Sequence, residues 1–169
     1  MKNRILRLTA VLIITTGHAA AADVAGHWQM QPAQSSFGSL DHDRCKTLTL
    51  AIDHDRLQFS SDFILDDGRH MTENFTVPLD GAAHALTTPL RLDPGSDWTP
   101  PSSGVAAQFK GSLLQIDEIM PAHADQWRHT QYYVDQHGDL VAQTSGRDLL
   151  GDKQARLLYR PTAAQTRCD

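Results

Sequence analysis

The chain has 169 residues, a length that suits a single domain, and its acidic residues outnumber its basic ones by 20 to 15. The first 22 residues hold three of the bases and no acid, so the remainder has 12 basic residues and a net charge of −8. This acidic balance, without a basic cluster, argues against binding to nucleic acid or to an anionic membrane surface, because both depend on lysine and arginine.

The N-terminal residues have the three parts of a cleavable export signal. Basic residues come first, a short apolar stretch follows at residues 8–16, and small residues occupy positions 19–22. The apolar stretch is about half as long as a membrane-spanning helix needs to be, and no cysteine for a lipid anchor follows it. The sequence therefore predicts a signal peptide at residues 1–22, a mature domain at residues 23–169 without a membrane span, and a secreted or periplasmic location.

The mature part alternates apolar and polar residues in short runs between turn residues, which is typical of antiparallel β-structure. A first strand is expected around residues 24–29. The clearest hairpin joins residues 57–65 to residues 71–79 through a loop containing Gly68, and a tight turn at residues 54–55 joins the preceding run to it. These turns predict the following pairs, all on one face: Ile52–Leu57, Leu50–Phe59, Leu57–Val77, Phe59–Phe75 and Phe63–Met71.

The second half of the domain continues this pattern. A turn at residues 111–112 and a loop at residues 136–138 close two further hairpins, and a last strand is expected around residues 155–160. Residues 91–104 and 121–125 interrupt the alternation and are expected to be loops. The predicted pairs in this half are Phe109–Leu114, Ala107–Ile116, Val134–Leu140 and Tyr132–Ala142.

These elements predict an all-β fold of about eight antiparallel strands in up-and-down order. A meander of this length avoids exposed edges best by closing into a barrel. A barrel of about eight strands has room for its own side chains or for one small ligand. The alternative architecture is a two-sheet β-sandwich.

The two ends of the domain resemble the lipocalin-like, or calycin, β-barrels. Gly26-His27-Trp28, at the start of the first strand, is similar to the Gly-x-Trp motif of that group, and Arg160 stands at the end of the last strand. The resemblance implies that Trp28 closes one end of the barrel and that Gly26 permits its close approach. It also implies that Arg160 lies across the indole face in a cation–π contact.

Cys45 and Cys168 are the two cysteines of the chain. An even number of cysteines in an exported domain predicts a disulfide, which here would tie the C-terminal tail to the early part of the domain. A position next to the C-terminus suits such a link better than it suits a reactive thiol. A bridge from the tail to an early strand is also frequent among the barrels that the chain resembles.

The inferred inner face carries a set of large apolar and aromatic side chains. In a barrel of this kind they would contact an apolar or amphipathic ligand. They would otherwise fill the interior by packing against one another, and the sequence leaves both interpretations open. The candidate ligand-binding residues are Phe59, Phe63, Phe75, Phe109, Ile116 and Tyr132.

Catalytic and metal-binding patterns are weak. The histidines do not form pairs such as His-x-His, and a Gly-x-Ser-x-Gly nucleophile motif is absent. Asp117 and Glu118 are adjacent in a strand, so they face opposite sides and cannot act together on one substrate. We therefore assign no catalytic residue, no metal site and no cofactor. His129 is the best-placed imidazole, and a structural or exposed role is favoured for it.

Glu73 is the exception on the inner face, where the predicted register sets it opposite Ser61. A buried carboxylate needs a partner or a raised pKa. A polar ligand group or a proton-transfer role would explain it. The favoured interpretation is that a bulge or the mouth of the barrel leaves this carboxylate in water.

Three functions are compatible with these features. The first is an exported barrel that binds a small apolar or amphipathic molecule without catalysis. The second is an acidic protein-binding module, such as an inhibitor of a basic cell-wall hydrolase, with the loop at residues 91–104 reaching its partner. The third is an isomerase- or cyclase-type enzyme, which would require buried groups with shifted pKa values near a pocket and is less favoured.

Overall fold

The computed structural model describes residues 23–38, 43–87, 91–92, 104–120, 123–148, 151–164 and 166–168. The predicted signal peptide and most of the predicted loop at residues 91–104 lie outside these ranges. The elements in chain order are β1 (Gly26–Met30), η1 (Pro32–Gln34), β2 (Asp43–Asp53), β3 (Arg56–Leu65), β4 (His70–Pro78), β5 (His84–Ala85), β6 (Arg91–Leu92), β7 (Gly104–Lys110), β8 (Leu113–Met120), β9 (His123–Val134), β10 (Leu140–Asp148) and β11 (Gly151–Pro161).

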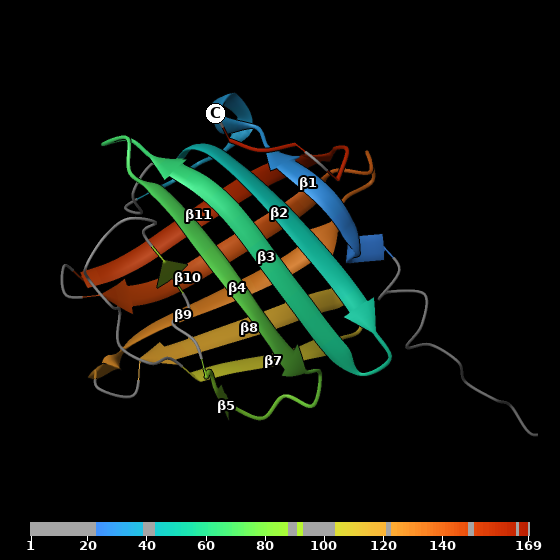
Figure 1. Ribbon diagram of the computed structural model, residues 1–169, viewed down its shortest axis with the longest axis vertical. Coiled ribbons are helices and arrows are strands. Elements are labelled where there is room, and N and C mark those ends of the chain that lie inside the picture. Colours follow the sequence, from blue (N-terminus) through green and yellow to red (C-terminus); the bar gives the residue numbers. More distant parts are fainter. Residues whose placement is uncertain are drawn as a thin grey trace, which may run out of the picture.

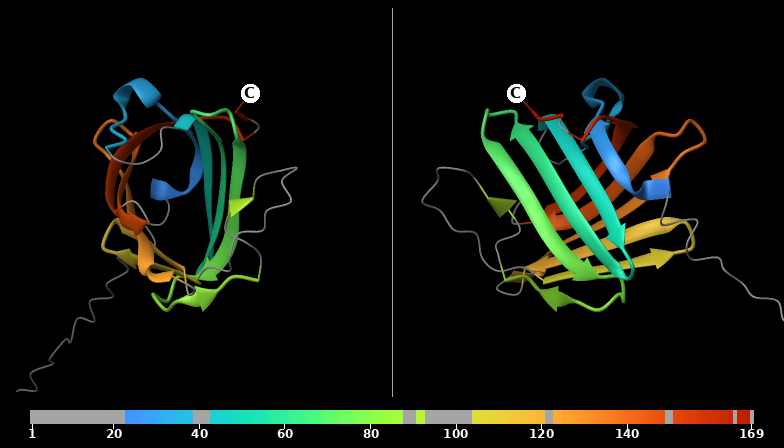
Figure 2. Two further views of the ribbon diagram at one scale, coloured as in Figure 1. Left: turned by 90° about the vertical axis from the view of Figure 1, so that its left-hand side faces the viewer. Right: turned by 45° about the vertical axis from the view of Figure 1, so that its right-hand side comes forward.

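All strands of the described residues belong to one antiparallel sheet, in the order β5-β7-β8-β9-β10-β11-β1-β2-β3-β4-β6. The sheet curls so that β1–β4 and β7–β11 face each other across a shared interior, as Figure 1 and the left view of Figure 2 show. Strand β1 joins the two groups by pairing with both β2 and β11. The predicted barrel is confirmed as a nearly closed one with more strands than the expected eight, and the sandwich is wrong because the sheet is continuous.

The hairpin registers predicted from the alternation are confirmed. Strands β3 and β4 pair Phe59 with Phe75, and β9 and β10 pair Tyr132 with Ala142. Gly68 and Gly138 adopt φ values of 87° and 81°, a left-handed conformation that glycine takes at little steric cost. The remaining predicted pairs of the β2–β3 and β7–β8 hairpins are also present. Turn chemistry and alternation together therefore set the inner face.

A continuous hydrophobic cluster occupies part of the barrel interior. The indole of Trp28 is buried in it, and its Nε1 donates a hydrogen bond to the carbonyl oxygen of Val24 at 3.1 Å. A Cβ on Gly26 would come within 3.4 Å of the same indole nitrogen, so glycine permits the close approach of the ring. The cluster joins both halves of the sheet through the buried residues Leu48, Leu50, Leu57, Phe59, Phe75, Val77, Val105, Leu114, Ile116, Tyr132, Leu140, Leu157 and Tyr159.

The structure corrects the role that the resemblance implied for Arg160. This residue is in register with Gln29, whereas Trp28 is in register with Pro161. Neighbouring residues of a strand point to opposite faces, so the guanidinium leaves from the outer face. It is exposed and contacts Gln34 at 3.4 Å instead of lying across the indole.

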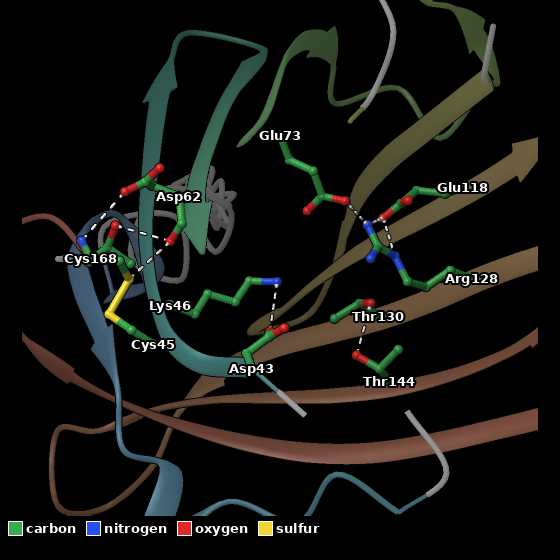
Figure 3. A network of polar contacts seen from close by, with 11 residues as sticks. Asp43, Cys45, Lys46, Asp62, Glu73, Glu118, Arg128, Thr130, Thr144 and Cys168 are labelled. Atoms are coloured by element: carbon green, nitrogen blue, oxygen red, sulfur yellow. Dashed lines mark hydrogen bonds and ion pairs between the residues drawn. A yellow bond between two sulfur atoms is a disulfide. The ribbon is translucent and has the colours of Figure 1, made fainter. Parts of the chain in front are cut away.

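The predicted disulfide is confirmed. Cys45 on β2 is bonded to Cys168, which is 123 residues away in sequence. The backbone N–H of Cys168 also reaches the carboxylate of Asp62 on β3, at 3.5 Å. Figure 3 shows the disulfide and the contacts with Asp62, which together fix Cys168 against β2 and β3.

Candidate functional site

Three charged side chains from three strands meet inside the barrel (Figure 3). Arg128 of β9 lies beside Glu118 of β8, its partner in the strand register, and across the interior from Glu73 of β4. The guanidinium Nη2 is 2.6 Å from Oε1 of Glu73 and 2.5 Å from Oε1 of Glu118, and Nε donates to the same Glu118 oxygen at 2.7 Å. We call these three residues the inner triad.

The inner triad is strongly shielded from solvent. The side chain of Glu73 is only 1% exposed, that of Glu118 is 12% exposed and that of Arg128 is 21% exposed. The triad therefore opens to solvent on the side of Arg128. The interpretation that Glu73 lies in water is wrong, because an arginine from the opposite side of the interior supplies its partner.

Electrostatics fix the charge state of the cation. Burial alone would lower the pKa of Arg128, but the carboxylates of Glu118 and Glu73 outweigh it and hold that pKa above its ordinary value. Burial also raises the pKa of the phenols of Tyr132 and Tyr159. At neutral pH the interior therefore contains a permanent guanidinium and two neutral phenols.

Further polar groups line the same part of the interior. Lys46 of β2 lies opposite Phe63 of β3 in the register, and its Nζ is 4.6 Å from the centre of that ring. The same ammonium forms an ion pair with Asp43 at 3.8 Å. Thr130 and Thr144, on β9 and β10, share a hydrogen bond of 3.1 Å (Figure 3). This half of the barrel interior is thus polar, in contrast to the hydrophobic cluster.

Two buried polar atoms have no hydrogen-bond partner among the described residues. One is Oγ of Ser61, a residue that is 2% exposed and lies directly across from Glu73 on the neighbouring strand. The other is Nε2 of Gln126, two residues before Arg128 on β9. A buried hydroxyl or amide without a partner lowers the stability of the folded state. The stability of the fold therefore gives no reason for a polar side chain at either position.

The six predicted ligand-binding residues are placed together on the interior side. Phe59 stacks on Phe75 with ring centres 4.6 Å apart, and its ring meets that of Tyr132 edge-on at 6.5 Å. Ile116 belongs to the same cluster, and Phe109 is partly buried against it. Phe63 is buried beside Lys46. Apart from Phe63, these side chains therefore pack together as part of the hydrophobic cluster.

The sequence analysis did not identify Arg128 as an interior residue, and it did not predict that Glu118 would contact it. The prediction that Asp117 and Glu118 face opposite sides agrees with the structure, since Asp117 contacts His129 at 2.5 Å on the outer face. That contact also places the candidate imidazole outside the barrel. The alternation along β9 could have revealed the arginine, because Arg128 and Thr130 are in the same phase as Tyr132 and therefore face inward too.

A separate groove of about 630 Å³ lies on the outer face of β2–β4. Its walls are outward-facing side chains such as Gln58, Ser60 and Thr76, together with residues 84–87. The lining combines uncharged polar residues with apolar ones such as Ala51 and Leu86. The groove is distinct from the inner triad, because Glu73 lies on the other face of β4 and the other two members belong to β8 and β9.

The described residues contain neither a cluster of metal ligands nor a membrane-spanning helix. No group of three or more His, Cys, Asp or Glu side chains there is arranged to hold a metal ion. Within the same ranges, no helix has the length and apolar character that crossing a membrane requires.

Comparison with known proteins defines the class of fold. No protein-family model and no curated protein matches the chain. Among solved structures, secretory abundant heat soluble protein 4 from Ramazzottius varieornatus superposes with a TM-score of 0.57 at 11% identity, covering 83% of this chain and 96% of that one. The apo lipid binding protein 8 of Caenorhabditis elegans gives a TM-score of 0.56 at 9% identity, with the same coverage. Zebrafish ileal bile acid-binding protein, complexed with cholic acid, gives 0.50 at 12% identity, covering 83% and 99%.

The fold is therefore that of the calycin-type β-barrels, as the two ends of the sequence suggested. At these identities the likeness concerns the fold alone. The inner triad and its surroundings are features of this chain, and its function is inferred from them.

Proposed function

We propose that the chain is exported and binds a small, partly apolar molecule inside its barrel, without chemical conversion. The export part rests on the predicted signal peptide. The binding part rests on the interior, where a polar half that opens to solvent at Arg128 adjoins a floor of aromatic side chains. An amphipathic molecule matches this division, with its polar end near the triad and its apolar end against the rings. Two proteins of the same fold carry lipid or bile acid binding in their names.

The observation that carries the proposal is the buried Glu73–Arg128 ion pair. A buried ion pair contributes little to stability compared with well-packed apolar side chains, because desolvation offsets the attraction. A barrel that served only as a scaffold would fill this space with apolar residues. The orphaned hydroxyl of Ser61 beside the pair points the same way.

The charge states of the interior support binding rather than catalysis. Arg128 and Tyr132 both keep their protons near neutral pH, since their pKa values are raised. Neither group can therefore act as a general base toward a substrate under those conditions. An isomerase-type reaction would have to take its base from other groups.

Native mass spectrometry of the protein purified from the envelope fraction tests the proposal. We expect a bound small molecule that is lost on denaturation. Titration with an environment-sensitive apolar dye should give a saturable signal, which an Arg128→Met variant weakens and an Arg147→Met variant, altered on the outer face, does not. Absence of both a bound molecule and a saturable dye signal would refute ligand binding.

A second candidate is the acidic protein-binding module, and one observation favours it. The aromatic half of the barrel is filled by its own side chains, as expected for a barrel that presents its outer surface to a partner. The net charge of −8 that the chain has without residues 1–22 would then attract a basic protein. Inhibition of a basic wall hydrolase such as lysozyme by the purified chain, suppressed by salt, would support this candidate over the first.

A further inference from the structure

The inner triad determines which polar groups the barrel can accept. Arg128 is linked to the surroundings of the orphaned hydroxyl of Ser61 through Glu73, which lies across from Ser61 on the neighbouring strand. Its Nε and Nη2 atoms are engaged by carboxylates from two different strands. The triad taken alone has one positive and two negative charges, so it offers an incoming anion no net attraction.

A carboxylate ligand would face a large penalty at this position. To bind Nε or Nη2 of the guanidinium it would have to displace Glu73 or Glu118, which would leave a protein carboxylate buried without its partner. Alternatively, it would lie beside both carboxylates in a poorly solvated space, where like charges repel strongly. The second cation of this half, Lys46, is already in an ion pair with Asp43 and over the ring of Phe63.

An uncharged hydroxyl group has suitable partners at the same place. The hydroxyl of Ser61 can donate one hydrogen bond and accept others, and the unpartnered Nε2 of Gln126 can donate to the oxygen of a ligand hydroxyl. Both groups lack partners among the described residues, and their residues are only 2% and 9% exposed, respectively. The paired hydroxyls of Thr130 and Thr144 add further neutral partners. The polar half is thus equipped with neutral hydrogen-bonding groups around a cation that is already neutralised.

We propose that the barrel takes an amphipathic molecule whose polar end is an uncharged hydroxyl group, and that the triad of Glu73, Glu118 and Arg128 rejects the corresponding carboxylate. This inference rests on the proposed ligand-binding function and specifies its ligand class. Its ligands would be long-chain alcohols or lipids with hydroxyl head groups, and fatty acids would be excluded.

Calorimetric titration of the purified chain with dodecanol and dodecanoate at neutral pH tests the inference. The two probes share one hydrocarbon chain and differ in the head group. We expect dodecanol to bind at least roughly tenfold more tightly. Equal or tighter binding of dodecanoate would overturn the inference and leave the binding function intact. If neither probe binds, the binding function fails and the inference fails with it.

Variants of the triad test the cause of the selectivity. Glu118→Gln removes one negative charge from the partly exposed member of the triad, and we expect it to narrow the ratio between the two probes by roughly threefold to tenfold. Asp117→Asn, on the outer face of the same strand, should leave the ratio unchanged. Equal effects of the two substitutions would overturn the role of the triad.

Substitution of Ser61 separates recognition from folding. Ser61→Ala removes a buried hydroxyl that has no partner, so the unliganded variant should be at least as stable as the wild type. Its affinity for dodecanol should nevertheless fall roughly threefold to tenfold. Ser60→Ala, on the outer face of β3, should leave both quantities unchanged. A Ser61→Ala variant that loses stability but keeps its affinity for dodecanol would overturn the assignment.

Discussion

At the scale of single residues, Arg128 connects two halves of the barrel that share no strand ladder at that point. Its guanidinium touches Glu118 on the neighbouring strand and Glu73 on the far side of the interior. Both contacts are shielded from water, so screening by salt is weak. The arginine therefore stabilises the closed barrel, in addition to its proposed part in ligand selection.

Replacing Arg128 with methionine should destabilise the protein by about 3–5 kcal/mol, because two shielded carboxylates would lose the guanidinium between them. Arg147→Met is the matched control, since Arg147 pairs with Asp152 on the exposed outer face. That change should cost at most about 1 kcal/mol. Equilibrium unfolding in urea measures both, and equal losses for the two variants would contradict the prediction.

Tyr132 and Tyr159 predict how stability depends on alkaline pH. Burial raises the pKa of both phenols above the value of 10.0 expected for a free tyrosine. Above that pH the unfolded chain releases protons that the folded chain retains, so stability is complete below pH 10 and falls as pH rises. Each phenol should contribute about 1.4 kcal/mol per pH unit to this loss.

Tyr132→Phe isolates one of these two contributions. The variant should show a shallower decline of the free energy of unfolding above pH 10 than the wild type. Denaturant titrations at a series of alkaline pH values give the slope. An unchanged slope would mean that the Tyr132 phenol does not titrate differently in the two states.

At the scale of elements, much of the fold follows from alternation and turn chemistry. Gly68 and Gly138 marked loops whose length fixed the pairing on either side, and the pairs of β3 with β4 and of β9 with β10 formed as expected. Such short loops leave one register for each hairpin, because a slip by one residue would turn the apolar face outward. Local sequence therefore determined these strands.

The candidate site was less accessible to the same reasoning. The pairing of β8 with β9 shifts register at a bulge between Ile119 and Met120. Counting residues outward from the connecting loop therefore does not predict that Glu118 lies beside Arg128. Strands β4 and β9 are not neighbours, so no hairpin register relates Glu73 to the arginine. Sequence alternation could show that each side chain faced inward, but only the closed barrel shows which of them meet.

Gly146 of β10 shows how closely the strands approach one another at the triad. A Cβ at this position would lie 2.7 Å from the carbonyl oxygen of Trp127 and 3.4 Å from Cα of Arg128. Gly146→Ala should therefore displace β9 and destabilise the protein by about 1–3 kcal/mol. Gly104→Ala is the control, because its Cβ would meet no atom closer than 3.9 Å. Thermal unfolding that ranks Gly104→Ala as the more damaging change would refute this account.

At the scale of the whole molecule, the disulfide between Cys45 and Cys168 joins residues that are 123 positions apart in sequence. By the chain-entropy model, closing a loop of this length stabilises the folded state by about 4–5 kcal/mol. The double variant Cys45→Ala/Cys168→Ala should lose about that much, and the wild type under reducing conditions should match it. Guanidinium unfolding with and without reductant provides the measurement, and a loss below about 1 kcal/mol would contradict the model.

The pairing of β1 with β11 has a consequence for the order of events during synthesis. The first strand of the domain finds one of its two neighbours only when the last strand has been made. Contacts between segments so far apart form slowly, because a long stretch of chain must first be brought together. Most of the hairpins can form while the polypeptide is still emerging, but the barrel can close only after β11 has emerged as well.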